Sequence, residues 1–175
     1  PALPDTWDAI DGLGRMLPAH DNVGGPRDRF VGIFYLTWHN DPHRKSENVS
    51  RIIKETPDAA DDYGHPVWSG VNIGHWDEPV YGYYQTYHKW VLRRHAELLA
   101  NAGVDVVMLD CTNGTMLWDE SYLAVLETFS QARKDGVNAP KAASLLPLHW
   151  PGDPKNPENC RVLLRKIYTL VYKPG

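Results

Sequence analysis

The chain has 175 residues, carries a net charge of −4 at pH 7 and contains no basic run longer than two residues. This length allows one sizeable hydrophobic core, whereas the charge lacks the basic footprint of a nucleic-acid-binding protein. No apolar run approaches the roughly 20 residues that span a bilayer, and the first residues have neither the basic nor the apolar region of a signal peptide. We therefore expect no nucleic-acid partner and no membrane partner.

Aromatic and imidazole side chains are unusually frequent, with seven Trp, nine Tyr and eight His, and many of them fall in expected loops. Such enrichment is typical of surfaces that stack sugars or other flat ligands, although ordinary cores also contain it. The two cysteines, Cys111 and Cys160, form no Cys-x-x-Cys motif and indicate no disulfide framework. Cys111 is more readily explained as a buried, unreactive thiol than as a nucleophile.

The first part of the chain contains one predicted strand and one predicted helix. Residues 1–30 form an extended lead-in, with a short helical turn near 7–16. The apolar run at 31–37, VGIFYLT, predicts a buried strand. Residues 46–55 predict a short helix with Ser46 as its N-cap.

The next part follows a long loop at 56–87, which is rich in Gly, Pro and aromatic residues. Residues 88–102 have the apolar spacing of an amphipathic helix, with His95 on its inner face as a packed side chain. Gly103 ends this helix. The apolar run at 104–109 then predicts a second buried strand.

The last part continues the alternation of helices and strands. Asp119 caps a helix at 120–135, residues 141–148 predict a weaker third strand, and Asn156 caps a final helix at 157–172. Strands separated by helices predict the α/β class, in which right-handed helical crossovers join parallel strands.

Polar and aromatic residues gather where the predicted strands end. In a parallel α/β fold, ligands bind beyond the carboxyl ends of the strands. The candidates at these ends are Tyr35, Trp38 and His39 after the first strand, Asp110, Thr112 and Asn113 after the second, and His149 after the third. Each of them is also explained singly as a loop residue that caps a helix or satisfies backbone groups.

The loop segment at 74–84, GHWDEPVYGYY, places two adjacent acids, Asp77 and Glu78, among aromatic side chains. Acids of this kind can hydrogen-bond to sugar hydroxyls while the rings stack against sugar faces. The candidate substrate contacts in this loop are His75, Trp76, Glu78, Tyr83 and Tyr84. The alternative is an aromatic loop that packs over the strand ends, with its acids in solvent.

Several side chains of the chain could in principle bind a metal ion. The side chains that could converge on a metal are His39, His43, His75, His149, Asp77 and Asp110. However, the chain has no His-x-His at the first strand end and no His-Glu-x-x-His on a helix. We therefore predict no metal ligands.

Three segments, VGIFYLTWHN, GHWDEPVYGYY and WVLRRHAELLANAGVDVVMLDCTNG, resemble the N-terminal part of (β/α)8-barrel, or TIM-barrel, glycoside hydrolases. They are most similar to the group around the endo-α-mannosidases and endo-α-1,3-glucanases. The resemblance runs from about 31 to 136, and the second segment is its most distinctive part. It implies that 1–175 is a single domain, an incomplete N-terminal portion whose first three β/α units lie at 31–175.

The resemblance also implies an activity, the hydrolysis of a polysaccharide or glycan by two carboxylic acids, with no metal and no organic cofactor. One acid protonates the departing glycosidic oxygen, and the other attacks the sugar or activates water. The candidate catalytic residues are Asp110 and Glu78, and we expect Asp110 to hold a sugar hydroxyl or orient a catalytic group. In such barrels the catalytic acids usually follow later strands, so the remainder of the barrel is an expected partner.

Such enzymes are commonly exported, so the resemblance implies a secreted or periplasmic protein. Two other functions remain open at this point. The first is a non-catalytic carbohydrate-binding protein that uses its aromatic rings as stacking platforms. The second is a metal-dependent hydrolase of the same barrel fold.

Overall fold

A small parallel sheet lies at the centre of the structure. The structure is a computed structural model that describes residues 9–19, 22, 28, 30–38, 47–71, 78–146 and 156–172. Its strands are β1 (Gly32–Tyr35), β2 (Val106–Asp110) and β3 (Lys141–Leu145). They pair in parallel in the order β1-β2-β3, with Tyr35 opposite Leu109. The predicted α/β class and the parallel strands are therefore confirmed.

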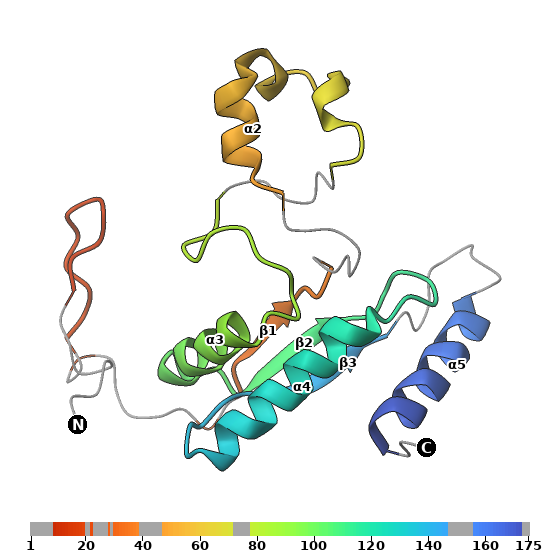
Figure 1. Cartoon of the computed structure of the whole chain (residues 1–175). Helices are drawn as coiled ribbons and strands as arrows, with labels where there is room; N and C mark the ends of the chain where they lie inside the picture. Colours follow the sequence, from red (N-terminus) through yellow and green to blue (C-terminus); the bar gives the residue numbers. More distant parts are fainter. Residues whose placement is uncertain are drawn as a thin grey trace.

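Two helices, α3 (Lys89–Asn101) and α4 (Asp119–Lys134), pack on one face of the sheet (Figure 1). Successive strand side chains point to opposite faces, so Val107 and Leu109 both point toward the helices, where they are fully buried. Phe129 of α4 belongs to the same core. Because burying a side chain of this size contributes about 1.5–3 kcal/mol, this layer supplies much of the stability.

The opposite face of the sheet is open among the described residues. Phe34 and Leu36 on the β1 side are 49% and 45% exposed, and Leu145 at the end of β3 is 38% exposed. Exposed apolar side chains on one face of a sheet are typical of a face that another segment or molecule covers. The sheet is thus covered by α3 and α4 on one side only.

The C-terminal helix joins the same core. It comprises α5 (Asn156–Ile167) and a π-helical turn at Tyr168–Tyr172. Leu163 is fully buried in the core, and the Nζ of Lys166 donates to the carbonyl oxygen of Thr115 at 3.0 Å. The predicted final helix is therefore confirmed, with a wider last turn.

The predicted long loop at 56–87 contains two short helices. Together with α2 (Val49–Glu55), the 3-10 helices η2 (Pro57–Ala60) and η3 (Pro66–Trp68) form a helical segment between β1 and α3. The indole N–H of Trp68 donates to two carbonyl oxygens, one in η2 and one in the turn after it, at 3.1 and 3.0 Å. Figure 1 shows this segment beyond the carboxyl end of β1.

The helix predicted at 46–55 begins later than expected. It begins at Val49, and its N-cap is Asn48, whose side-chain oxygen accepts a hydrogen bond from the N–H of Arg51 at 2.8 Å. Ser46, the predicted cap, lies outside the described residues. Asn and Ser are equally good caps, so residue type alone does not choose between them.

Three other predicted element ends shift by a few residues. Asp119 is the first residue of α4 rather than its cap, a position where an acid interacts favourably with the helix dipole. The cap position is taken by Trp118, in the left-handed conformation with a φ of 57°. Asn156 is the first residue of α5 rather than its cap. The third strand ends at Leu145, and residues 147–148 lie outside the described residues.

The predicted helical turn near 7–16 is wrong over its described residues. This segment makes a reverse turn that an antiparallel bridge between Ile10 and Met16 closes. The carboxylate of Asp11 accepts hydrogen bonds from two backbone N–H groups in the turn, both at 2.9 Å. Such local side-chain bonds compete with helix formation, which explains the outcome.

Candidate functional site

Asp110 is the last residue of β2, and its side chain is almost completely buried, with 2% exposed. Strand alternation assigns it to the open face of the sheet, together with Val106 and Met108. Its Oδ1 accepts two hydrogen bonds from Thr112, one from the backbone N–H at 3.0 Å and one from the hydroxyl at 2.7 Å. These bonds form an Asx turn that fixes the orientation of the carboxylate at the carboxyl end of the central strand.

Cys111, the next residue, is buried in the core on the helix side. Burial raises the pKa of its thiol to about 11, and the neighbouring Asp110 adds to the shift. The thiol therefore stays protonated at neutral pH, and its Sγ donates to the carbonyl oxygen of Leu109 at 3.6 Å. This agrees with the predicted role as an unreactive buried residue.

The polar segment after β2 is a compact turn. The N–H of Gly114 donates to the carbonyl oxygen of Thr112, and the N–H of Met116 donates to that of Asn113, both at 3.1 Å. The side chain of Thr112 is engaged with Asp110, whereas Asn113 is half-buried. Thr112 and Asn113 are both predicted substrate contacts. Thr112 instead holds the carboxylate of Asp110, a candidate catalytic residue, in place.

Thr37 is a buried polar residue at the end of the first strand that was not among the predicted substrate contacts. It lies just after β1 and is fully buried, and its hydroxyl has no hydrogen-bond partner among the described residues. Burying an unpaired hydroxyl costs about 1–3 kcal/mol, so such a group is unusual. In the sequence, the signal that points to Thr37 as a candidate site residue is its position directly after an apolar strand. The next residue, Trp38, is a predicted substrate contact and is 40% exposed.

A tyrosine-rich segment at 79–87, here called the strap, leads into α3 and follows directly after Glu78. The hydroxyl of Tyr83 lies 3.2 Å from the backbone N and 3.0 Å from the Oγ of Ser50, which ties the strap to α2. Glu78 is exposed, whereas Asp110 is buried. The two candidate carboxylates therefore occupy different environments, one open to solvent and one held in place.

Two predicted substrate contacts, Tyr35 and Tyr84, meet at His95 of α3. The hydroxyl of Tyr35 lies 2.8 Å from Nδ1 of His95, and the hydroxyl of Tyr84 lies 3.5 Å from Nε2. Burial raises the pKa of both tyrosines and lowers the pKa of His95. The ring of Tyr35 also packs edge-on against Phe129 of α4. Tyr35 therefore points toward the helices, on the face opposite to Asp110.

The structure leaves several predicted residues undescribed. Four predicted substrate contacts lie outside the described residues: His39, His75, Trp76 and His149. Of the six candidate metal ligands, all but Asp110 lie outside the described residues: His39, His43, His75, His149 and Asp77. Within the described ranges, no group of three or more His, Cys, Asp and Glu side chains is placed to hold a metal ion. In the same ranges, no helix combines the length and the apolar character needed to span a bilayer.

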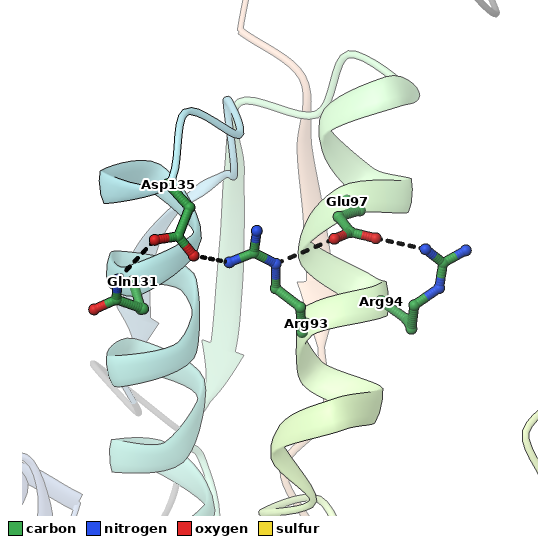
Figure 2. Close-up of polar contacts among 5 residues, drawn as sticks. All are labelled: Arg93, Arg94, Glu97, Gln131 and Asp135. Carbon is green, nitrogen blue, oxygen red and sulfur yellow. Dashed lines mark hydrogen bonds and ion pairs between the residues drawn. The ribbon is translucent and has the colours of Figure 1, made fainter.

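A polar groove of about 390 Å³ lies between α3 and α4, and its lining residues are Lys89, Arg93, Glu127, Thr128 and Gln131. Figure 2 shows that Arg93 bridges Glu97 on its own helix and Asp135 after the end of α4. The second carboxylate oxygen of Asp135 accepts from Gln131 at 2.8 Å. These charged groups are paired with one another, and the ion pair between Arg93 and Asp135 joins α3 to the end of α4. The groove contains none of the predicted site residues.

Comparisons of the chain with protein-family models, with curated proteins and with solved structures find no match. The candidate site is therefore defined by its own geometry. It comprises a fixed carboxylate, Asp110, at the end of the central strand, the polar turn that follows it, and the strap with the exposed Glu78.

Proposed function

We propose that the chain forms the first three β/α units of a TIM-barrel glycoside hydrolase that acts on a polysaccharide or glycan. The arrangement of the sheet supports this proposal. The strands are parallel and follow one another in sequence order, and α3 and α4 pack on the same face. The wall of a TIM barrel has this arrangement, whereas a doubly wound sheet carries helices on both faces. The open face would then be the barrel interior, covered by the remaining strands.

The observation that carries the proposal is the placement of Asp110. A carboxylate at the carboxyl end of a parallel strand, on the face opposite to the helices, occupies the position from which barrel enzymes bind substrates. Its two bonds from Thr112 keep it in one orientation. With only 2% exposed, it is suited to orienting a catalytic group or a sugar hydroxyl.

Glu78 is the second carboxylate of the proposal. It is exposed directly before the strap, and the described residues include no internal partner for it, so it can meet a substrate or water. Glycoside hydrolysis needs one carboxylic acid that protonates the leaving oxygen and one carboxylate that attacks the sugar or activates water. We assign Glu78 to one of these roles and expect the partner acid from Asp110 or from a later strand of the barrel. The chemistry requires no metal and no organic cofactor.

The test is a hydrolysis assay of the full-length gene product on a panel of glycans that includes α-1,3-glucan and α-mannan. The measured quantity is the reducing sugar that is released. We expect Asp110→Asn and Glu78→Gln to lower turnover about 100-fold or more, in the range of acid–base catalysis, while both variants remain folded. The matched controls are Asp119→Asn and Glu120→Gln, two exposed acids at the start of α4. Wild-type turnover in both site variants would exclude this assignment.

The same experiment separates the other two functions. Glycan binding without hydrolysis would indicate a carbohydrate-binding protein, for which the partly exposed Trp38 offers a stacking surface. Hydrolysis that a chelator abolishes would indicate a metal-dependent enzyme. Either result contradicts the two-carboxylate proposal.

A further inference from the structure

A histidine caps the short helix η3. The backbone N–H of Val67 donates to Nδ1 of His65 at 3.2 Å. On the other side of the ring, Nε2 lies 3.6 Å from a carboxylate oxygen of Asp58 in η2. The side chain of His65 is 25% exposed, so the ring lies between these two neighbours and is open to solvent only in part.

These two contacts assign the proton of the neutral ring. A backbone N–H can only donate, so Nδ1 of His65 must be the nitrogen that carries no proton. The proton of the neutral ring is then on Nε2, where it faces the carboxylate of Asp58. The neutral ring therefore suits both of its neighbours at once.

Protonation of the ring removes the cap. An imidazolium carries a proton on both nitrogens, so Nδ1–H of His65 and the N–H of Val67 would face each other as two donors. A hydroxyl group could reverse its role in such a contact, but a backbone N–H has no lone pair with which to accept. The bond from Val67 is therefore lost, whereas the contact with Asp58 becomes an ion pair.

The other titratable groups near His65 come from η2 and the turn that follows it. Asp58 lies in η2, and Asp61, Asp62 and Tyr63 lie in the turn. The carboxylate of Asp62 accepts from a backbone N–H of the turn at 2.9 Å. Aspartate side chains are ordinarily ionised and tyrosine side chains neutral throughout pH 5–8, the range in which imidazole changes charge. Protonation in this range therefore acts on the ring.

The rest of η3 is held by bonds that do not involve the ring. The backbone N–H of Trp68 donates to the carbonyl oxygen of His65, and that of Val71 donates to the carbonyl oxygen of Trp68, both at 3.0 Å. The indole N–H of Trp68 is bonded to two further carbonyl oxygens. Protonation therefore frees the N–H of Val67 and leaves the body of the turn in place.

We propose that His65 is a proton-sensitive cap, which closes the start of η3 when its ring is neutral and opens it when the ring is protonated. The cap lies in the helical segment beyond the carboxyl end of β1, the end of the sheet that carries the candidate site (Figure 1). Its opening requires no glycan, so it is independent of the proposed function.

Hydrogen exchange of valine amides tests the cap in the full-length gene product, labelled with 15N-valine and measured by NMR at pH 8.0 and 5.0. Rates are corrected for the intrinsic effect of pH. We expect the amide of Val67 to exchange about fivefold faster or more at pH 5.0, because it loses its cap. The amide of Val71 is the internal control and should keep its protection. Equal corrected exchange of Val67 at the two pH values would overturn the proposal.

Two histidine variants locate the effect. In His65→Asn, the side-chain Oδ1 takes the place of Nδ1 and accepts at every pH, so we expect Val67 to stay protected at both pH values. The matched control is His88→Asn, because His88 is exposed and makes no capping bond, and it should retain the wild-type dependence. A pH dependence that survives in His65→Asn, or that disappears in His88→Asn, contradicts the cap.

The proton assignment is tested on the unaltered protein, so this measurement does not depend on the folding of a variant. With 15N-histidine in the full-length gene product, the nitrogen chemical shifts of His65 at pH 8.0 should be those of the Nε2–H tautomer, and both nitrogens should carry protons at pH 5.0. An Nδ1–H tautomer at pH 8.0 would contradict the cap. None of these measurements uses a glycan, so their failure is distinct from failure of the proposed function.

Discussion

Asp110 illustrates how a buried carboxylate can be held by the residue two positions further along the chain. Both bonds to its Oδ1 come from Thr112, one from the backbone and one from the side chain. The Asp-x-Thr pattern is a local signal, because Asp side chains commonly bind the backbone two residues on. The turn therefore forms from neighbouring residues, whereas the burial of Asp110 depends on the packed sheet.

At this scale we predict the effect of removing the hydroxyl. Thr112→Val keeps the shape of the side chain and the backbone bond but deletes the 2.7 Å bond to Asp110. A hydrogen bond to a buried carboxylate contributes more than an average one, so the free energy of unfolding should fall by about 1–2 kcal/mol. Urea denaturation measures this value. Thr115→Val, at an exposed threonine of the same turn, is the control, and an equal loss in both would refute the role of the hydroxyl.

At the scale of the elements, the strand and helix that surround the candidate site follow ordinary rules of local structure. The helix α3 ends at Asn101, and Gly103 then adopts a φ of +70°, which lets the chain reverse into β2. This left-handed conformation costs an L-residue with a Cβ atom about 1–2 kcal/mol. Glycine at this position therefore determines where α3 ends and where β2 begins.

The corresponding prediction concerns Gly103→Ala. An added Cβ would meet no atom within 4 Å, so the cost is that of the backbone conformation alone, about 1–2 kcal/mol of unfolding free energy. Gly12→Ala is the matched control, since its Cβ would also meet nothing and its φ is not in the left-handed region. Thermal or chemical denaturation of the two variants gives the comparison. An unchanged free energy of unfolding in Gly103→Ala would mean that the turn relaxes to a conformation without this cost.

At the scale of the whole molecule, the asymmetry of the sheet is the dominant feature. One face carries the core of α3 and α4, while the other presents apolar side chains such as Phe34 and Leu145. Parallel sheets are ordinarily covered on both faces. Under the proposed function, the further strands of the barrel cover this face.

This proposal predicts a large effect for Phe34→Ser in the full-length gene product. If further strands bury Phe34, its loss should lower the free energy of unfolding by about 3 kcal/mol or more, as for other buried aromatic side chains. The control is Val80→Ser, because Val80 is 95% exposed in the strap. A change below about 1 kcal/mol would mean that the face stays in solvent, which contradicts the barrel.

Much of the fold could be read from local patterns. Apolar runs and helical spacing predicted the three strands and the main helices, because these signals report which side chains must leave water. The prediction that the strand at 31–37 is buried was wrong, because Val31, Phe34 and Leu36 are about half exposed. The apolar run at 104–109 located Asp110, because this residue directly follows it at the end of the second strand. The first turn and the caps were less accurate, since competing local hydrogen bonds, such as those of Asp11 and Asn48, depend on small differences between similar side chains.

The partners of the site residues required the folded chain. Period-two alternation separates Tyr35 from Phe34 on β1, but it does not say which face the helices cover, and so Tyr35 was expected at the strand end rather than beneath α3. Its bond to His95 joins residues 60 positions apart, and the bond of Tyr84 joins the strap to the same ring. Such contacts arise when the crossover helices pack against the sheet, because burial then brings together side chains that have no relation along the sequence.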